Sequence, residues 1–292
     1  YNTKKGVQAA VNNHKALEKA VKEHGLSMLN CMALGPVPVF YSHDTAVTRC
    51  SMDYFLNDID MARFHIWQSY HNSLWLGQTV WCDHDMFHSS DPLCARLMAV
   101  AHAVSGGPVY LSDAPEDFNT PVVMPLCYED GKLIRASAPA VPLPDSLMFD
   151  PRKVKKSYRV IAPAINGAAA IVAYNLHEQK DASIAGYVSL DDYRCREALV
   201  QPYTGKSQVP EEGLVLYDWY KKKGELLTDR YEFKLEGLSD RLILLCPVKD
   251  GWAVIGRSDK YLSPATVSQI RTGQSSLSFT LKESGPVISS AK

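Results

Sequence analysis

The sequence lacks the features that identify several large classes of protein. No run approaches the roughly 18 apolar residues that a membrane span needs, so we expect no membrane partner. The formal net charge is −1 and the sequence pI is near 6.8, so we expect no nucleic-acid partner. No Gly-x-Ser-x-Gly segment is present, which argues against a serine nucleophile.

The seven cysteines are an odd number without a Cys-x-x-Cys pair, so they do not predict a disulfide framework. We interpret them as buried thiols. A zinc site from Cys82, His84 and His88 is conceivable, but these residues lack the paired spacing of zinc ligands. We expect both histidines to make hydrogen bonds around a loop instead. The cellular compartment stays open, because free thiols suit a reducing site and are also found in exported proteins.

Residues 1–136 alternate short apolar strands with amphipathic helices. Apolar spacing predicts helices over residues 3–24 and 59–76, and Asp91-Pro92 has the signature of a third helix start. The expected strands are Ser27–Ala33, ended by Gly35–Pro38, then Thr45–Thr48, Thr79–Trp81 and Pro108–Leu111. This alternation predicts parallel βα units, and four units make half of an eight-stranded barrel.

A half-barrel by itself exposes two open sheet edges and an apolar interior, which is unfavourable. The chain also begins on a helix with no strand before it. We therefore expect a missing N-terminal portion, the other half of the barrel, as a partner of this chain.

The second part of the chain has a different pattern. Four prolines indicate a linker over residues 137–156. Residues 157–292 read as short strands without intervening helices, which predicts an antiparallel sandwich or barrel. We interpret Trp219–Lys223 as a solvated loop. The expected strands are Tyr158–Ile161, Ala169–Asn175, Ser183–Ser189, Glu212–Tyr217, Glu232–Leu235, Leu242–Pro247, Ala253–Gly256 and Leu277–Leu281.

Charged residues follow two of the expected N-terminal strands. Arg49 and Asp53 come after one strand, and Asp83 and Asp85 come after the next. Catalytic groups of βα barrels converge at the carboxyl ends of the strands, and paired carboxylates perform acid/base work at glycosidic bonds. The sequence therefore predicts a glycosidase site with Asp53 as the general acid/base.

Each of these residues has a second interpretation. Arg49 either donates to a sugar hydroxyl or pairs with Asp53 to fix the loop. We expect Asp83 and Asp85 to point to opposite sides of an extended segment, one toward a sugar and one bracing a loop; a divalent-cation site is the alternative. Trp81 either stacks on a sugar face or belongs to the core.

Three segments are long enough to compare with known families. Residues 46–55 read AVTRCSMDYF, residues 83–89 read DHDMFHS and residues 103–115 read AVSGGPVYLSDAP. They resemble segments of family 36 glycoside hydrolases, in the branch of raffinose synthases and seed-imbibition-protein-like alkaline α-galactosidases. The matching segments of that branch are Arg-x-Ser-x-Asp, Asp-Trp-Asp-Met-Phe-His-Ser and Ala-Ile-Ser-Gly-Gly-Pro-Ile-Tyr-Val-Ser-Asp-Ala-Pro. The resemblance covers roughly residues 1–150.

The resemblance implies an α/β plus all-β fold. Residues 1–136 then form the second half of a (β/α)8 TIM barrel, and residues 157–292 form a C-terminal antiparallel β-sandwich. It also implies a retaining α-galactosidase that hydrolyses terminal α-galactosides of oligosaccharides and needs no cofactor or metal.

The resemblance also implies roles for individual residues. Asp53 corresponds to the acid/base and Arg49 to a substrate-binding arginine. Cys31 corresponds to a strand-end position beside the sugar pocket. Asp83 and Asp85 correspond to a pair near that pocket.

Three departures from the family pattern bear on function. Met52 stands where the plant branch usually has Asp, and His84 stands where it has Trp, so substrate preference is open. The family's nucleophile lies in a Lys-x-Asp motif, which this chain does not contain. We therefore expect the chain alone to be inactive. A raffinose-synthase-type galactosyltransferase and a non-catalytic carbohydrate-binding relative are the alternatives.

Overall fold

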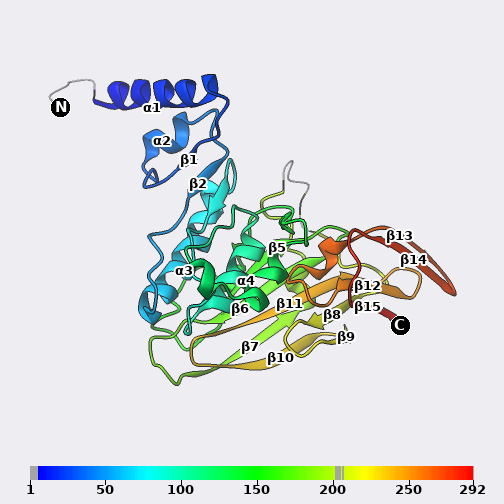
Figure 1. Ribbon diagram of the computed structural model, residues 1–292. Coiled ribbons are helices and arrows are strands. Elements are labelled where there is room, and N and C mark those ends of the chain that lie inside the picture. Colours follow the sequence, from blue (N-terminus) through cyan, green and yellow to red (C-terminus); the bar gives the residue numbers. More distant parts are fainter. Residues whose placement is uncertain (1–5, 201–204, 206, 292) are drawn as a thin grey trace.

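The computed structural model describes residues 6–200, 205 and 207–291 (Figure 1). In its first part helices alternate with three parallel strands, which pair in the order β1-β2-β3. The expected parallel βα arrangement is confirmed for these strands, while residues 3–5 of the first expected helix lie outside the described residues. The elements are α1 (Gly6–Glu23), β1 (Leu29–Asn30), α2 (Pro36–Tyr41), β2 (Val47–Arg49), α3 (Ile59–Leu76), β3 (Trp81–Asp83) and α4 (Ala95–Ser105).

The third strand begins two residues later than expected. The amides of Thr79 and Val80 both donate to the carbonyl oxygen of Leu76, at 3.0 Å each. These residues therefore finish the last turn of α3, and strand pairing starts only at Trp81. The carboxyl end of β3 is consequently Asp83 itself.

The expected strand at Pro108–Leu111 is wrong. Leu111 forms one isolated parallel bridge with Phe87, and no longer ladder develops around it in the described residues. Pro108 has no amide hydrogen to donate, which limits pairing at this point. Gly106, at φ +69°, ends α4 in the left-handed conformation.

Two expectations about helix starts also need correction. The segment Gly35–Pro38 does not simply end a strand, because Pro36 opens α2 at the first helical position, where its missing amide hydrogen has no cost. Helix α4 starts at Ala95 rather than beside Asp91, whose side chain instead accepts the amide of Leu93 in a preceding turn at 2.8 Å.

The second part is built from antiparallel strands. Six strands form one sheet in the order β4-β5-β6-β11-β8-β9, and three further pairs are β7–β10, β12–β15 and β13–β14. Two short helices, α5 (Thr120–Val123) and α6 (Leu190–Tyr193), lie between strands or before them. The strands are β4 (Val141–Pro142), β5 (Tyr158–Pro163), β6 (Ala169–Asn175), β7 (Ser183–Ser189), β8 (Leu214–Asp218), β9 (Lys223–Leu227), β10 (Arg230–Glu236), β11 (Ser239–Pro247), β12 (Trp252–Arg257), β13 (Val267–Gly273), β14 (Ser276–Leu281) and β15 (Val287–Ala291).

The sequence did not reveal four of these strands or the short helices α5 and α6. The missed strand β9 is largely exposed, β13 and β15 mix partly buried and exposed residues, and β4 is only two residues long, so none shows a clear apolar alternation. The solvated loop expected at Trp219–Lys223 is also wrong in part. Trp219 is buried and donates its indole N–H to the carbonyl of Lys260 at 2.8 Å, and Lys223 opens β9.

The six-stranded sheet is largely exposed at its edge strand β9, whereas it is buried on both faces at β5 and β6, where every residue is buried. Alternate residues of these strands belong to two separate core clusters. One face packs against α3 and α4, where the hydroxyls of Tyr70 and Tyr174 lie 2.8 Å apart and His71 Nδ1 lies 2.8 Å from the hydroxyl of Tyr158 (Figure 1). The boundaries proposed at residues 136 and 156 stay predictions. Among the described helices, none is long and apolar enough to cross a membrane.

Gly107 lies directly against the backbone of β3, so a larger residue at this position tests how closely the chain after α4 packs on that strand. A Cβ at this position would lie 2.2 Å from the carbonyl oxygen of Cys82 in β3. We expect Gly107→Ala to lower the free energy of unfolding by about 1–3 kcal/mol, since the clash is with backbone that cannot rotate away. Gly35→Ala is the matched control, because its Cβ would meet only Pro38 at 3.9 Å. Equal urea midpoints for the two variants would contradict this packing.

Candidate active site

Arg49 is the centre of a charged group at the carboxyl ends of β2 and β3. It lies opposite Asp83 in the parallel register. Its Nε is 3.0 Å from Asp83 Oδ2, its Nη2 is 2.6 Å from Asp85 Oδ1 and its Nη1 is 3.1 Å from Asp53 Oδ1. One guanidinium therefore binds three carboxylates from two successive strand ends, and the predicted grouping of these four residues is present.

Burial by itself lowers the pKa of Arg49, but its hydrogen bond to Asp83 and the charges of Asp85 and Asp83 outweigh it and raise that pKa. Arg49 thus stays charged at any ordinary pH. The phenol of Tyr110 completes the group: it donates to Asp83 Oδ2 at 3.0 Å and lies 3.3 Å from Arg49 Nη2. Burial, with the charge of Asp83, raises the pKa of Tyr110, so the donating proton is retained.

The expectation that Asp83 and Asp85 point to opposite sides is wrong, since both contact Arg49. Residues two apart in a strand share a face, and the chain turns at Asp85, where φ is +70°. Asp83 Oδ1 accepts the amide of Asp85 at 2.9 Å, and Asp85 Oδ2 accepts the amide of Tyr54 at 2.7 Å. Both carboxylates are buried and use both of their oxygens within the protein.

Asp53 differs from the other two carboxylates in its exposure. Its side chain is 69% exposed, against 0% for Asp83 and 6% for Asp85. It lies on the loop after β2, where the preceding amide, that of Met52, donates to Gln68 Oε1 of α3 at 2.8 Å. Of the three carboxylates on Arg49, Asp53 is therefore the one that a substrate can reach.

Cys31 and Trp81 stand apart from this group. Cys31 is exposed and follows β1 directly, level with Arg49 because Asn30 lies opposite Thr48. In the described residues, no hydrogen bond or ion pair joins Cys31 to the group. Trp81 starts β3, two residues before Asp83, and the guanidinium of Arg135 covers its ring at 4.5 Å.

Of the two histidines on the loop after β3, His84 does not make the expected hydrogen bonds within the described structure. Neither ring nitrogen of His84 has a hydrogen-bond partner among the described residues, although the side chain is buried. Burial, together with the charges of His102 and His65, holds the pKa of His84 well below its usual value. His88 stacks against Tyr54, with ring centroids 6.0 Å apart.

The imagined zinc site is not assembled. Cys82 packs with Cys50 and Leu76 in a small buried cluster. In the part of the chain that the structure describes, no group of three or more His, Cys, Asp or Glu side chains could hold a metal ion. All seven cysteines are free thiols; five are buried as expected, whereas Cys31 is exposed and Cys195 is partly buried.

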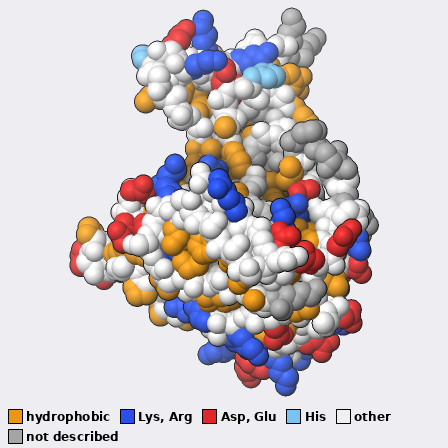
Figure 2. All heavy atoms as spheres, turned by 90° about the vertical axis from the view of Figure 1, so that its right-hand side faces the viewer, with side chains coloured by type: hydrophobic (Ala, Val, Ile, Leu, Met, Phe, Trp, Pro, Cys, Tyr) orange, Lys and Arg blue, Asp and Glu red, His pale blue; other side chains and the backbone are white. Residues whose placement is uncertain are grey.

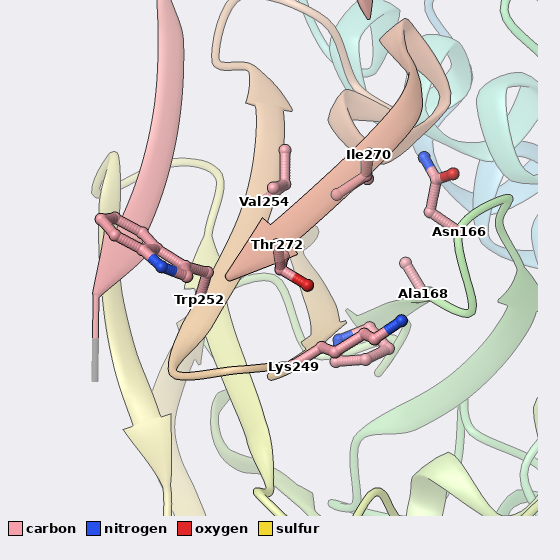
Figure 3. A pocket seen from close by; sticks show the side chains of 8 residues that line it. Asn166, Ala168, Lys249, Trp252, Val254, Ile270 and Thr272 are labelled. Atoms are coloured by element: carbon pink, nitrogen blue, oxygen red, sulfur yellow. The ribbon is translucent and has the colours of Figure 1, made fainter. Parts of the chain in front are cut away.

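A separate cavity of about 240 Å³ lies among the C-terminal strands (Figure 3). Two of its polar side chains are engaged within the protein: Asn166 donates to the carbonyls of Pro264 and Val267, and the Trp252 indole donates to the carbonyl of Gly273. No carboxylate lines it. The cavity therefore offers no carboxylate for acid/base work, whereas the Arg49 group has three.

Comparison with known proteins identifies the family. Residues 3–177, more than half of the chain, match the family described as raffinose synthase or seed imbibition protein Sip1. The chain belongs to this family. The family match covers the Arg49 group, α3 and α4, and extends through β5 and β6.

Named relatives are much longer than this chain. The probable galactinol–sucrose galactosyltransferase 6 of Arabidopsis thaliana is 35% identical over 142 residues, which are 48% of this chain and 19% of that protein. The galactinol–sucrose galactosyltransferase of Pisum sativum is 29% identical over 204 residues, which are 63% of this chain and 25% of that protein. The chain thus spans about a fifth to a quarter of the length of these relatives.

Solved structures show the same fold at low identity. The α-galactosidase I of Mortierella vinacea matches with a TM-score of 0.54 and 13% identity, over 82% of this chain and 64% of that one. The family 27 β-L-arabinopyranosidase of Geobacillus stearothermophilus matches with a TM-score of 0.57 and 16% identity, over 82% and 54% of the two chains. At these identities the likeness shows a shared fold, that of TIM-barrel-type glycosidases.

The unpartnered ring of His84 leads to a stability prediction. His84→Phe keeps an aromatic ring against Tyr70, now at 5.2 Å between centroids, and removes two buried nitrogens without partners. We expect the free energy of unfolding at pH 7 to rise by about 1–3 kcal/mol.

The gain should grow as the pH falls below 6.5, the usual pKa of histidine. Below that pH, His84 is protonated in the unfolded chain but stays neutral in the folded protein, where its pKa is lowered. Falling pH therefore lowers the free energy of unfolding of the wild type, and His84→Phe removes this effect. Urea unfolding at pH 7 and pH 5.5 measures both effects, with the half-buried His88→Phe as control. A loss of stability in His84→Phe at both pH values would show that its ring has a partner.

Proposed function

We propose that this chain is part of an enzyme that cleaves terminal α-galactosidic bonds of oligosaccharides, with Asp53 as the general acid/base. The observation that carries the proposal is the exposure of Asp53 on the buried group formed by Arg49, Asp83 and Asp85. Membership of the raffinose synthase family and the fold shared with α-galactosidases support it. One of these, from Saccharomyces cerevisiae, was solved with raffinose.

In this proposal the reaction proceeds in two steps with retention. A carboxylate nucleophile attacks the anomeric carbon while Asp53 protonates the departing oxygen, and the galactosyl group becomes bonded to the enzyme. Asp53, now ionised, then takes a proton from water as the water releases galactose. Arg49 holds the loop of Asp53 against β3, so the acid stands at a fixed place relative to the strand ends.

We assign the nucleophile to the N-terminal half of the same barrel, and place this half against the exposed side of β1. Retaining carboxylates stand roughly 5–5.5 Å apart. Asp83 and Asp85 are poor candidates, because both are buried and bonded to Arg49. The sequence contains no Lys-x-Asp motif that would supply another.

The surface around β1 supports this assignment. In the described sheet β1 pairs with β2 alone, so its other edge is open. Large apolar side chains beside it are exposed, including Leu26 at 67%, Met32 at 91% and Phe40 at 70%. Figure 2 shows hydrophobic side chains at the narrowing between the upper lobe, which holds α1, and the larger body. A second barrel half would pair the strand edge and bury these groups, and residues 157–292 would serve as the β-sandwich of the enzyme.

A galactosyltransferase is the second candidate function. It differs only in the acceptor of the second step, a sugar hydroxyl in place of water. The relatives named galactinol–sucrose galactosyltransferase favour it. Product analysis with an α-galactosyl donor, with and without sucrose, separates the two: a hydrolase releases free galactose, whereas a transferase makes a trisaccharide. A carbohydrate-binding relative without activity would bind the donor and make neither product.

The role of Asp53 is tested in the longest natural reading frame that contains this chain. We expect Asp53→Asn to lower kcat/KM for α-galactosides by about 10²–10⁴-fold, because it removes the acid/base. The loss should be smaller for aryl galactosides with an acidic phenol, whose departure needs less protonation.

The matched control is Asp60→Asn. Asp60 is also an exposed carboxylate paired with an arginine, 2.6 Å from Arg63 Nη1, but it lies in the first turn of α3 and is bonded to none of the Arg49 group in the described residues. The activity of Asp60→Asn should stay within about twofold of the wild type, because neither Asp60 nor the buried Arg63 is bonded to the Arg49 group in the described residues. Full activity in Asp53→Asn would refute the assigned role, and turnover by the 292-residue chain alone would refute the assigned position of the nucleophile.

A further inference from the structure

His65 contacts both loops that carry the Arg49 group. Its side chain comes from α3 and is buried. Its Nδ1 lies 3.0 Å from the carbonyl oxygen of Met52, the residue directly before Asp53, and its Nε2 lies 2.8 Å from the carbonyl oxygen of His84, between Asp83 and Asp85. One rigid ring thus spans the loop of the proposed acid/base and the loop of the buried carboxylates.

A second imidazole braces the same region from the other helix. His102 of α4 has its Nε2 2.8 Å from the carbonyl oxygen of Asp85 and its Nδ1 2.8 Å from that of Met98. Side chains of both α3 and α4 therefore contact backbone carbonyls of the loop after β3. The loop after β2 is tied to α3 at two of its backbone residues in the described structure: His65 and Gln68 contact Met52, and Asn72 donates to the carbonyl of Cys50 at 2.6 Å.

The protonation of His65 limits what this ring can do. Burial, followed by the charge of His102, lowers the pKa of His65 to about 4, so the ring is neutral at neutral pH. A neutral imidazole has a single N–H and a single acceptor nitrogen. It therefore donates a hydrogen bond to only one of its two carbonyls, and it meets the other by packing alone, without a hydrogen bond.

We propose that His65 is a positioning residue, which sets the loop of Asp53 at its working distance from the loop of Asp83 and Asp85. Its effect on catalysis rests on the proposed function, whereas its hold on the two loops does not. Displacing a reacting group by about 1 Å can cost about a hundredfold in rate. No direct contact of His65 with substrate is needed for such an effect.

The test compares histidine variants of α3 in the complete protein. His65→Leu removes both polar contacts. His65→Asn keeps an amide near the position of Nδ1, and His65→Gln keeps one near Nε2. His71→Leu is the matched control, since His71 also uses both ring nitrogens, but toward the Tyr158 hydroxyl at 2.8 Å and the Leu147 carbonyl at 3.2 Å, on the side of the six-stranded sheet.

Two readouts are taken from each variant. The first is hydrogen exchange at the amides of Met52 and Tyr54, which donate to Gln68 and Asp85 respectively. The second is kcat and KM for an α-galactoside. We expect His65→Leu to speed exchange at both amides and to lower kcat about 10–100-fold with KM within about threefold. At least one of His65→Asn and His65→Gln should have a higher kcat than His65→Leu. The gain should be at least tenfold if His65→Leu loses a hundredfold in kcat, and proportionally smaller if the loss is smaller.

The outcomes separate the two proposals. His71→Leu should leave exchange at these amides and kcat within about twofold, even if it lowers the melting temperature as much as His65→Leu. Equal exchange and equal kcat in His65→Leu and His71→Leu would overturn the positioning role, as would the failure of both amide variants to restore the rate. If the wild type acts on no α-galactoside, the proposed function fails, and unchanged amide exchange in His65→Leu would then overturn the hold on the loops as well.

Discussion

The site depends on one buried guanidinium. Arg49 bonds Asp53, Asp83 and Asp85 at the ends of two parallel strands, and Asp83 is fully buried. Without Arg49 the two buried carboxylates would lose the only cation that binds them among the described residues, and breaking a buried pair in this way typically costs about 3–5 kcal/mol. The same contacts leave Asp53 as the exposed member. The contacts that stabilise the strand ends therefore also position the proposed acid, Asp53, where it is exposed.

Much of the framework could be predicted because it is encoded locally. Helix α3 has the expected bounds, 59–76, since Asp58 caps its start and Gly77 follows its end. Strands with continuous apolar residues, such as β6, were also found. Strand bounds were less certain where hydrogen bonds compete, as at Thr79, whose amide completes the preceding helix. Exposed polar strands such as β9 have no apolar pattern to detect.

The candidate site was predictable in part for the same reason. Arg49 and the three aspartates follow expected strands, so their meeting could be predicted from βα geometry alone. Tyr110 was missed because 61 residues separate it from Arg49, although it lies in a segment that resembles the family. His65 reads only as part of an amphipathic helix, and nothing in its spacing shows that both ring nitrogens face loop carbonyls.

The most direct test is a crystal structure of the longest natural reading frame that contains this chain, with a non-hydrolysable α-galactoside bound. The account predicts that a carboxyl oxygen of Asp53 lies within about 3 Å of the glycosidic heteroatom, while Asp83 and Asp85 stay bonded to Arg49. A sugar bound directly by Asp83 or Asp85, with Asp53 turned to solvent, would contradict it.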